Sequence, residues 1–397
     1  MSFDKELKLG DTFQELPKSK FQVQHADNIG HYPFYTSGDK VLTHSEFNLD
    51  DDIIFLATGG KANVKFNSGK AAYSTDTFAI KGKEHSSKYL YYLLLDKLSY
   101  IDRNFFSGSG LKHLQKKDFR NWLLNFPDDT NEEERIVQLL STLDRAIAST
   151  EQLIAKYQRI KTGLLHDLLT RGIDEHGDLR SEKTHKFKDS KLGRIPVEWE
   201  CKPLGEIYTD LKSGSTPLRK NKAYFENGTF LWVKTLDLNE DDIFDTQEKI
   251  TKRAIEESSC NLFPVNSVLI AMYGGWEQIG RTAVLKKEAT TNQAITALFN
   301  PRIGIVAEYI QFFLQHFRYK WKSYAVSTRK DPNITKTDIQ NYLIAFPKED
   351  AEQQNIVKAI KNSKRTISNY NDYLTKLQSL KTGLMQDLLS GKVRIKI

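Results

Sequence analysis

The sequence is poor in cysteine and in long apolar runs. Its 397 residues contain only two cysteines, Cys201 and Cys260, and their separation fits neither a disulfide framework nor a zinc-ligand spacing. No segment approaches the roughly 18 consecutive apolar residues that a membrane-spanning helix requires. The chain opens with MSFDK, without a basic segment followed by an apolar one, as a secretory leader would have. These absences predict a reduced cytoplasmic protein that has no metal site and no contact with a membrane.

The motifs with which enzymes hold nucleotides or metals are also missing. No Gly-x-Gly-x-x-Gly follows a predicted strand, and neither a Gly-Lys-Ser/Thr phosphate loop nor a His-Glu-x-x-His pair occurs. Asp331-Pro332-Asn333 resembles part of an adenine-methylase tetrad, but the aromatic residue and the second proline are absent. The scattered histidines form no ligand set. We therefore predict no catalytic residue and no cofactor, with a nuclease of dispersed catalytic residues as an open alternative.

The net charge and the composition are compatible with most classes of soluble protein. Lys and Arg exceed Asp and Glu by 58 to 51, which gives a net charge of +7. A mild basic excess of this kind permits nucleic-acid binding without requiring it. With 39% hydrophobic residues, the chain can build ordinary cores, and its length suits two or three domains at roughly 150 residues each.

The chain does contain a long internal repeat. The stretch KTGLLHDLL at 161–169 returns as KTGLMQDLL at 381–389, an offset of 220 residues (381 − 161 = 220). Phe126-Pro127 returns as Phe346-Pro347 and Ile136-Val137 as Ile356-Val357, at the same offset. This period is far above the roughly 20–50 residues of solenoid repeats, so a domain-sized unit is used twice.

Two long amphipathic helices are predicted, at about 131–171 and 351–390. Apolar residues recur there at spacings of four and three, which is typical of helices that pair in a coiled coil. Glu132-Glu133-Glu134 lies in the first turn of the first helix, where carboxylates complement the helix dipole. Gly163 and Gly383 interrupt the pattern and suggest close approach of the two helices, with a local kink as the alternative. The positions that we assign to helix pairing or partner binding are Ile136, Leu143, Ile147, Tyr157, Leu164, Leu168, Ile356, Ile367, Leu377, Leu384 and Leu388.

The segments before the helices read as mixed, strand-rich domains. Strands are predicted at 53–57, 64–66, 77–80 and 268–271, each bounded by a turn signal. Residues 89–95 suit a buried helix or a strand, and Ser86-Ser87 favours a capped helix. The predicted α+β organisation is a domain at 1–128, a long helix at 129–172, a charged surface linker at 173–199, a second domain at 200–349 and a second long helix at 350–391.

Polar loops of both domains carry side chains that suit DNA contact. The loop at 209–222 gathers cations and hydroxyl groups, and that at 273–281 interleaves aromatic, amide and Arg side chains. Lys and Ser/Thr can bind phosphates, whereas Arg, Gln and Asn can read base edges. Any single residue of such a loop is more often merely solvated, but the repetition on two domains favours DNA contact. The candidates are Lys61, Asn63, Lys65, Lys70, Lys112, His113, Lys212, Ser215, Thr216, Arg219, Lys220, Lys222, Trp276, Gln278, Arg281, Arg329 and Lys330.

Together these motifs resemble the specificity subunit of a type I restriction-modification system. Each half has a variable domain, a Phe-Pro and an acidic-capped helix that closes with Lys-Thr-Gly-Leu-x-x-Asp-Leu-Leu. The second half adds Ile334-Thr335-Lys336-x-Asp338 and Glu352-Gln353. The first half departs from the usual Glu-Gln with Glu133-Glu134-Arg135, and we expect the same role. The resemblance covers essentially the whole chain.

The resemblance implies a non-catalytic reader of double-stranded DNA. Each variable domain would be a target recognition domain for one half of a bipartite site. The helices would pair as an antiparallel coiled coil with pseudo-twofold symmetry, and they would dock methyltransferase subunits. Forty helical residues span about 60 Å, enough to hold two readers a DNA turn of roughly 34–36 Å apart. S-adenosylmethionine, ATP and Mg²⁺ are expected on partner subunits only, with a restriction/translocase subunit joining for cleavage.

Two other readings remain open. One is a coiled-coil protein-interaction scaffold without DNA specificity, which a steep salt dependence of duplex binding would argue against. The other is a related system in which a single polypeptide fuses methylase and nuclease and borrows a similar specificity subunit. Neither the DNA target nor the length of its unread spacer follows from the sequence.

Overall fold

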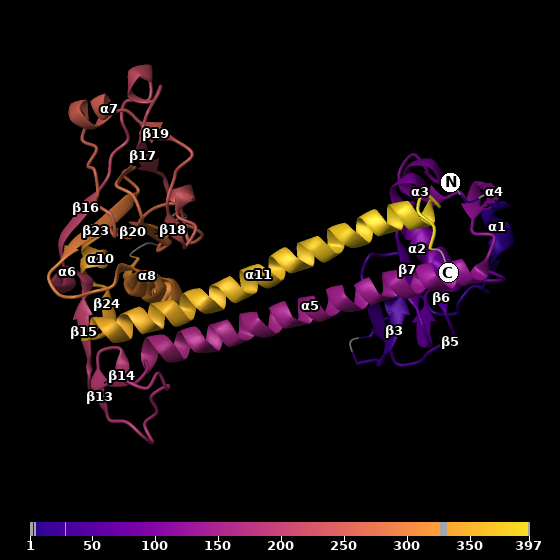
Figure 1. The fold of residues 1–397 in the computed structure, drawn as a ribbon, viewed down its shortest axis with the longest axis horizontal. Helices are drawn as coiled ribbons and strands as arrows, with labels where there is room; N and C mark the ends of the chain where they lie inside the picture. Colours follow the sequence, from indigo (N-terminus) through magenta and orange to yellow (C-terminus); the bar gives the residue numbers. More distant parts are fainter. Residues whose placement is uncertain (1–2, 4, 28, 326–331, 396–397) are drawn as a thin grey trace. The chain divides into compact units, whose positions relative to one another are not determined.

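The computed structural model describes residue 3 and residues 5–27, 29–325 and 332–395 of the chain. It divides into two compact units, which we call the first unit (Met1–Ile154 with Asn369–Ile397) and the second unit (Ala155–Ser368). Two long helices, α5 (Thr130–Thr170) and α11 (Asp350–Leu389), contribute to both units (Figure 1). Their bounds confirm the two helices predicted from the sequence.

The first unit is built on two four-stranded sheets. One has the order β2-β9-β6-β7, from β2 (Phe13–Glu15), β9 (Thr77–Gly82), β6 (Ile53–Ala57) and β7 (Val64–Asn67). The other has the order β4-β3-β8-β5, from β4 (Leu42–His44), β3 (Tyr32–Tyr35), β8 (Lys70–Tyr73) and β5 (Leu49–Asp50). Three of these strands confirm the predictions at 53–57, 64–66 and 77–80.

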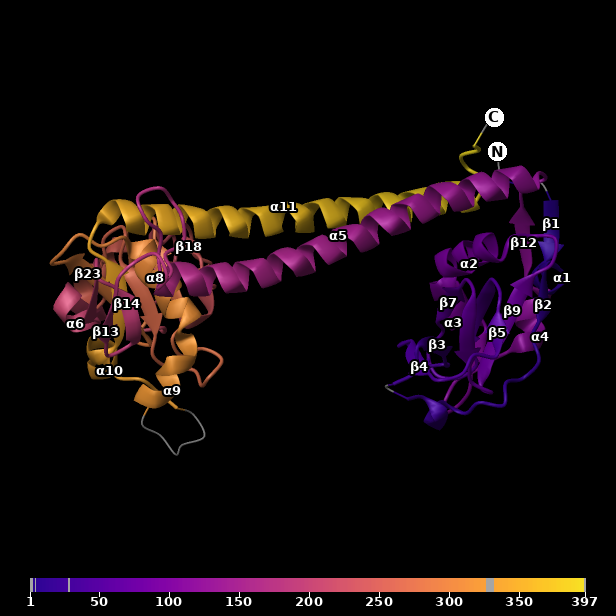
Figure 2. The same ribbon diagram turned by 90° about the horizontal axis from the view of Figure 1, so that it is seen from below.

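Helix α2 (Ser87–Asp96) resolves the ambiguity at 89–95. The Ser86 side chain accepts a hydrogen bond from the Tyr89 N–H and caps the helix. Helix α2 lies between α5 and the sheet of β6, β7 and β9 (Figure 2). Its side chains Tyr89, Leu90 and Leu93 pack into the core. The Tyr92 hydroxyl donates a hydrogen bond to Asp144 of α5 at 2.6 Å. The remaining elements are β1 (Lys5–Lys8), α1 (Leu9–Thr12), a 3₁₀ turn at Val23–His25, α3 (Leu98–Asn104), β10 (Phe106–Ser107), β11 (His113–Leu114), α4 (Lys116–Asn121) and β12 (Leu123–Phe126).

The second unit repeats this plan. Its main sheet has the order β16-β23-β20-β21-β18, from β16 (Tyr208–Ser213), β23 (Ile295–Pro301), β20 (Val268–Ala271), β21 (Thr282–Leu285) and β18 (Asp242–Ile243). The smaller sheet joins β19 (Lys249–Ile250), β17 (Phe230–Val233) and β22 (Ala289–Thr291). In both units a parallel pair, β3 with β8 and β17 with β22, belongs to the smaller sheet.

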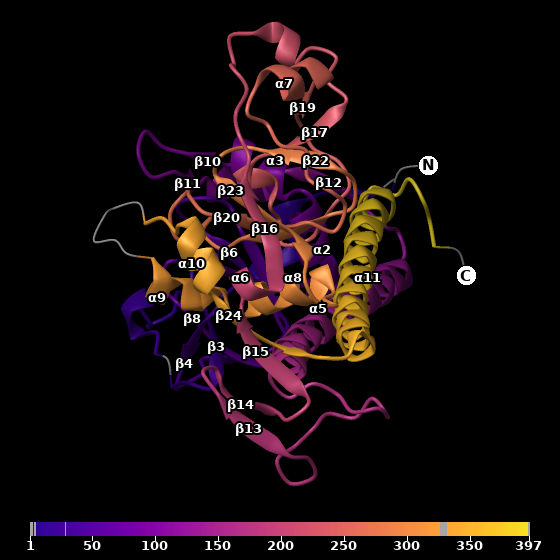
Figure 3. The same ribbon diagram turned by 90° about the vertical axis from the view of Figure 1, so that its left-hand side faces the viewer.

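The other elements of the second unit extend it at two opposite ends (Figure 3). The hairpin of β13 (Phe187–Ser190) and β14 (Gly193–Pro196) lies at one end, and α7 (Lys252–Glu257) lies with β17 and β19 at the other. Further elements are β15 (Trp199–Pro203), α6 (Leu204–Ile207), α8 (Ala307–His316), α9 (Trp321–Tyr324), α10 (Lys336–Asn341), β24 (Leu343–Pro347) and 3₁₀ turns at Lys222–Tyr224, Thr235–Asp237 and Arg318–Lys320.

The start of each long helix is hydrogen-bonded to the strand-rich domain that precedes it in the chain. Glu133 of α5 accepts a hydrogen bond from the Ser86 N–H at 3.3 Å, and Gln353 of α11 accepts one from the Val306 N–H at 2.8 Å. Both pairs are related by the offset of the repeat (353 − 133 = 220, 306 − 86 = 220). The departure of the first half from the Glu-Gln pattern therefore leaves this contact unchanged, as expected. Glu133 also binds the buried His85, with 2.5 Å between Nδ1 and Oε1.

The predicted antiparallel pairing of the helices is confirmed within each unit. In the first unit Ile136 and Leu140, near the start of α5, share a core with Met385 and Leu388, near the end of α11. In the second unit Leu168, near the end of α5, shares a core with Ile356 and Ile360, near the start of α11. Leu164 and Leu384 are partly buried against these cores and Leu377 is buried, whereas the side chains of Leu143, Ile147, Tyr157 and Ile367 are half-buried.

The expectation that Gly163 and Gly383 permit close helix approach is wrong. A Cβ atom built on either glycine meets no atom within 4 Å, and both residues are exposed. The seam that pairs the helices lies on the opposite side of each helix, at residues such as Leu168 and Leu388, which are 2% exposed.

Alanine at Gly163 or Gly383 is expected to stabilise the protein. An exposed helical glycine loses backbone entropy on folding, so each substitution should raise the free energy of unfolding by about 1 kcal/mol. Denaturant titration followed by circular dichroism measures it. Gly172→Ala is the matched control: Gly172 has φ of +65° and its added Cβ would lie 2.3 Å from Oε1 of Glu352, so that variant should lose stability. A loss in G163A would contradict the account.

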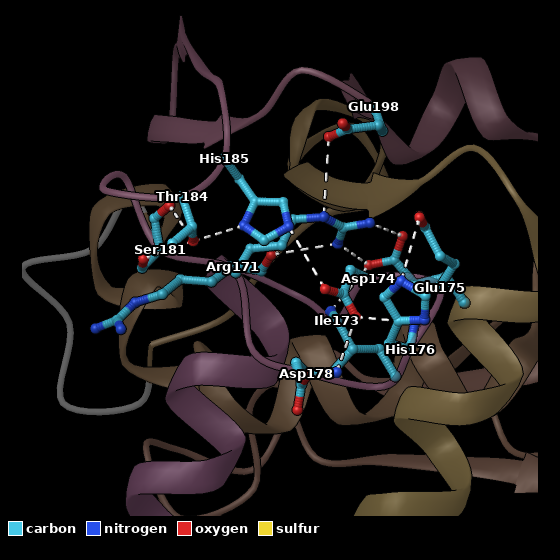
Figure 4. Close-up of polar contacts among 12 residues, drawn as sticks. Arg171, Ile173, Asp174, Glu175, His176, Asp178, Ser181, Thr184, His185 and Glu198 are labelled. Atoms are coloured by element: carbon cyan, nitrogen blue, oxygen red, sulfur yellow. Dashed lines mark hydrogen bonds and ion pairs between the residues drawn. The ribbon is translucent and has the colours of Figure 1, made fainter.

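Residues 173–199, predicted as a charged surface linker, fold onto the second unit. Asp174 accepts hydrogen bonds from the N–H groups of His176 and Asp178, and its carboxylate lies 3.6 Å from the His185 ring (Figure 4). Hydrogen bonds from the backbone, that of Asp178 above all, lower the pKa of Asp174. Residues Ile173, Arg180 and Ile195 are buried, which the charged composition did not indicate.

Each long helix has a carboxylate in its first turn that binds an arginine in the segment following the other long helix. In the second unit Glu352 binds Arg180, the Trp199 indole N–H at 3.1 Å and the Ile173 N–H at 3.2 Å. In the first unit Glu132, its counterpart (352 − 132 = 220), binds Arg394 through two nitrogens at 2.7 and 2.9 Å. The acidic first turns thus hold specific partners, a buried arginine in the second unit and a half-buried one in the first, in addition to complementing the helix dipole.

A second charged cluster joins α8 to α11. The carboxylate of Glu308 lies 2.6 Å from the Lys286 ammonium and 3.1 Å from that of Lys361. Burial alone would raise the pKa of Glu308, but hydrogen bonds and charge from Lys286, with a smaller contribution from Lys361, lower it to about 2. This carboxylate therefore stays ionised at neutral pH and links α8 to α11 through its ion pair with Lys361.

Candidate nucleic-acid interface

A cleft in the first unit forms where β3, β6 and β8 end. Strands β3 and β8 are parallel, so their carboxyl ends meet at one edge, and the loop after β6 closes the space beside them. The cavity measures about 380 Å³. It is lined by Ser37, Gly38, Asp39, Thr58, Gly59, Gly60, Lys61, Asn63, Asp76, Leu111 and His113. Carboxylate, amide, imidazole and ammonium groups thus face one concave surface, the mix of donors and acceptors with which base edges are read.

Hydrogen bonds between the loops fix the shape of this cleft. The hydroxyl groups of Ser37 and Thr58 both donate to the backbone carbonyl of Asp76, the former at 2.6 Å. The Ser37 hydroxyl in turn accepts from the Thr58 N–H at 3.1 Å. The ends of β3, β6 and β8 are therefore connected directly, and their loops form one surface.

Lys65 of β7 fixes the position of the loop after β3 through hydrogen bonds. Its ammonium group donates to the carbonyls of Thr36 (3.0 Å) and Gly38 and to the side chain of Asn63 (2.9 Å). Asn63 in turn donates to the Ser37 carbonyl at 2.7 Å. Burial lowers the pKa of Lys65. With its donors occupied, Lys65 acts on the cleft by positioning the loop.

The other first-domain candidates fall into three places. Lys61 and His113 line the cleft, and their side chains are exposed. Lys112 contributes its backbone carbonyl, which accepts from the Gly60 N–H at 2.8 Å. Lys70 lies at the opposite end of β8, where its ammonium group is 4.6 Å from the centre of the Phe47 ring. The structure thus gathers Lys61, Asn63 and His113 at the cleft and leaves Lys70 apart from them.

The second unit has a corresponding edge after β17, β20 and β22. Thr216, in the loop after β16, donates to the side chain of Gln293, which follows β22, at 2.5 Å. Ser215 contributes its carbonyl, which accepts from the Trp232 indole N–H at 3.2 Å. The prediction of a loop at 209–222 is wrong for residues 209–213, which belong to strand β16 and pair with β23. The residues that follow are joined to the β17–β22 sheet, although they differ from those of the first cleft.

Arg219 is engaged within the protein. Its guanidinium binds Glu248 at 2.5 Å and lies 4.6 Å from the centre of the Trp232 ring. Glu248 also binds Lys234 at 2.5 Å. Hydrogen bonds from Arg219 and then Lys234 lower the pKa of Glu248. Phosphate contact by Arg219 would therefore compete with an ion pair that is already formed.

The loop at 274–280 is held by Arg318, which the sequence analysis did not single out. Its guanidinium donates to the carbonyls of Glu277 at 2.8 Å and Ile279 at 2.9 Å. Trp276 in this loop is 46% exposed, so its ring is available for stacking. A cation bound to loop carbonyls thus recurs in both units, as Lys65 in the first and Arg318 in the second.

Comparison with known proteins agrees with this architecture. A family model described as the type I restriction modification DNA specificity domain matches residues 5–159 and 196–379. The chain belongs to this family. The MjaVIII specificity subunit of Methanocaldococcus jannaschii is 25% identical, over 98% of this chain and 93% of its own length. The EcoR124I/EcoR124II specificity subunit of Escherichia coli is 25% identical over 48% of this chain and 45% of its own.

Solved structures show the same fold. The S subunit of a type I restriction-modification system from M. genitalium has a TM-score of 0.64 at 17% identity, covering 97% of this chain and 95% of its own. A chain from a study of assembly and conformational transition of the type I system has a TM-score of 0.56 at 17% identity, with 98% of each chain covered.

The remaining candidates of this specificity-subunit family member are spread over the second unit. The ammonium group of Lys212, in strand β16, lies 5.8 Å from the centre of the Phe299 ring. Lys222 begins the 3₁₀ turn at Lys222–Tyr224, and Lys220 lies just before this turn. Gln278 keeps its side-chain oxygen buried, and Arg281 is half-buried. Arg329 and Lys330 lie outside the described residues. All remain predictions as DNA contacts.

Several cleft residues escaped the sequence analysis because their positions depend on pairing between distant strands. Ser37, Asp39, Thr58 and Asp76 are short polar residues after three separate strands. The available signal was the polar turn after each predicted strand, which marks loops in general. In the described ranges no three His, Cys, Asp or Glu side chains gather as metal ligands, and no helix is apolar and long enough to cross a bilayer.

Proposed function

We propose that this specificity subunit reads a bipartite DNA target, with one recognition domain for each half-site, and docks methyltransferase subunits on its long helices. The observation that carries the proposal is the repeated loop edge. The ends of β3, β6 and β8 in the first unit, and of β17, β20 and β22 in the second, form equivalent surfaces from different residues. Two equivalent but chemically different surfaces suit two different half-sites.

The side chains at these edges suit two different roles, phosphate contact and base reading. Lys61, Lys220 and Lys222 carry charges that can neutralise phosphates, which supplies affinity that is independent of sequence. His113 and Gln293 offer donors and acceptors for base edges, and Trp276 offers a ring. Specificity would then come from the cleft residues and affinity from the surrounding lysines.

The chemistry would belong to partner subunits. A methyltransferase subunit would bind S-adenosylmethionine and methylate adenine, and a restriction/translocase subunit with ATP and Mg²⁺ would join for cleavage. The chain itself would act in the cytoplasm without a cofactor of its own and without catalytic residues. Fusion of methylase and nuclease in one partner polypeptide is a variant of the same proposal.

Methylome sequencing tests the proposal. A host expressing this chain with its methyltransferase subunit is compared with a host expressing the methyltransferase alone. The expected result is a new methyladenine motif in two short halves around a fixed unread gap. Exchange of residues 1–128 for the corresponding domain of a relative should change one half only. An assembled complex that produces no new motif would favour the protein-interaction scaffold instead.

A further inference from the structure

The cleft after β3, β6 and β8 uses most of its polar side chains to hold its own shape. The hydroxyl groups of Ser37 and Thr58 donate to the Asp76 carbonyl. Asn63 donates to the Ser37 carbonyl at 2.7 Å and accepts from the Lys65 ammonium at 2.9 Å. Direct recognition of a ligand therefore falls to those lining side chains that are not committed in this way.

Two carboxylates line the cleft, and only one of them is free. The carboxylate of Asp76 accepts a hydrogen bond from the Ser74 hydroxyl. Asp39 is exposed, and its carboxylate has neither a hydrogen-bond donor nor an ion-pair partner among the described residues. Asp39 is thus the acidic group of the cleft whose hydrogen-bonding capacity is unused.

The backbone that carries Asp39 is nevertheless fixed. The carbonyl of Gly38, directly before it, accepts from the Lys65 ammonium, as does the Thr36 carbonyl at 3.0 Å. The Gly38 N–H donates to the Thr36 hydroxyl at 3.2 Å. Burial lowers the pKa of Lys65, and the charge of Asp39 partly offsets that shift. Asp39 is therefore presented at a defined position, as a group that reads a ligand must be.

A free carboxylate is costly on a surface that binds DNA. Phosphates repel it, so it lowers the affinity for every duplex regardless of sequence. An ionised carboxylate is also an acceptor only. The donors that base pairs expose are the amino groups of cytosine and adenine in the major groove and that of guanine in the minor groove. A contact with one of these amino groups would offset the repulsion.

Among these donors, the amino group of cytosine suits a carboxylate best. In an A·T pair the adenine amino group lies between two acceptors, adenine N7 and thymine O4, which would repel the carboxylate. In a G·C pair the cytosine amino group lies at the end of the edge and has one such neighbour, guanine O6. Lys61 and His113, the exposed donors of the same cleft, can bind phosphates and guanine acceptors.

We propose that Asp39 determines specificity in one half-site by accepting a hydrogen bond from the 4-amino group of a cytosine. The inference rests on the proposed function, because it requires that the cleft of the first unit reads DNA. It adds the identity of one base: the half of the motif that changes when residues 1–128 are exchanged contains a G·C pair read by Asp39.

The test uses the full-length chain in complex with its methyltransferase subunit and duplexes designed from the wild-type methylated motif. Each G·C pair of that half is replaced in turn, and affinities are measured by fluorescence anisotropy. The wild type should lose about fivefold to a hundredfold at the pair that Asp39 reads, the range for one good base contact. Asp39→Ala should lose this preference and bind a random duplex more tightly, because a repelling charge has been removed.

Two further variants separate base reading from charge. Asp39→Asn keeps the shape of the side chain and adds a donor, so it should admit adenine in place of the cytosine. Asp52→Asn is the matched control, since Asp52 is exposed directly before β6, whereas the cleft follows the other end of this strand. It should leave the methylated motif unchanged. The other half of the motif should stay the same in every variant.

The outcomes distinguish this inference from the proposed function. A half-site without a G·C pair in the part that residues 1–128 read overturns the inference and leaves the proposed function intact. The same holds if Asp39→Ala changes the affinity for cognate and random duplexes by one common factor, because the carboxylate would then act through repulsion alone. An assembled wild-type complex that produces no bipartite motif overturns the proposed function and the inference with it.

Discussion

Glu352→Ala is expected to destabilise the second unit by about 3–5 kcal/mol, because it leaves a buried guanidinium with only the exposed Glu198 carboxylate, 4.0 Å away, as a counter-ion. The side chain of Arg180 is 8% exposed and that of Glu352 is 12% exposed. Removal of the carboxylate also leaves the Trp199 indole N–H and the Ile173 N–H without their acceptor. The loss should appear in denaturant titrations followed by tryptophan fluorescence, since four of the five tryptophans, Trp199, Trp232, Trp276 and Trp321, belong to the second unit.

Two variants separate this effect from a general loss of helix-capping charge. Glu349→Ala removes an exposed carboxylate one turn earlier and should change stability by no more than about 0.5 kcal/mol. Glu132→Ala, the equivalent change in the first unit, should cost less than Glu352→Ala, because the Arg394 side chain is 31% exposed and can be solvated. Equal losses at Glu352 and Glu349 would show that the buried pair contributes nothing special.

Lys65→Met is expected to abolish reading of one half-site while leaving the general attraction to DNA in place. The ammonium group holds the Thr36 and Gly38 carbonyls and Asn63, so its loss should free the loop that forms one wall of the cleft. Hydrogen bonds to charged groups contribute roughly 1.5–3 kcal/mol each. We therefore expect affinity for the cognate duplex to fall about ten- to a hundredfold, measured against a random duplex by fluorescence anisotropy.

Lys61→Met distinguishes positioning from direct contact. Lys61 is exposed at the same cleft, so its loss should weaken binding to cognate and random duplexes alike and reduce the salt slope by about one. If Lys65→Met behaves in the same way, Lys65 is a phosphate contact, and the positioning role is wrong. The methylated motif provides an independent readout, since only one of its halves should relax in Lys65→Met.

The duplication explains which features of the site could be predicted. The two long helices, their antiparallel pairing and the strands around Ile53–Ala57 and Val268–Ala271 follow from periodicity and repetition, which are local properties of the chain. The exposed faces of the helices were harder to interpret. Gly163 and Gly383 read as packing positions, although a Cβ atom built on either would have open space around it, with no contact to the other helix within 4 Å.

Polar residues showed the limit of reasoning from local sequence. Lys65 and Arg219 read as cations free to contact DNA, as Lys61 does, yet one is bound to backbone carbonyls and the other to Glu248. Residues 173–199 read as a linker because they are rich in charged and poor in apolar side chains, but Arg180 is buried beside a carboxylate far along the chain. In each case the decisive partner comes from another element.

The amino-acid sequence by itself determined the repeat, the two helices and the family of this protein, because residues at fixed spacing carry that information whatever the chain does elsewhere. Only the tertiary structure decided which charges are available to a ligand. That depends on the desolvation and pairing of each group, as the contrast between Asp144 beside Lys381 and Lys364 beside Lys161 shows. Two halves with the same fold and helix motif therefore differ in the charges beside their long helices, because the position of Asp144 in the first unit is occupied by Lys364 in the second.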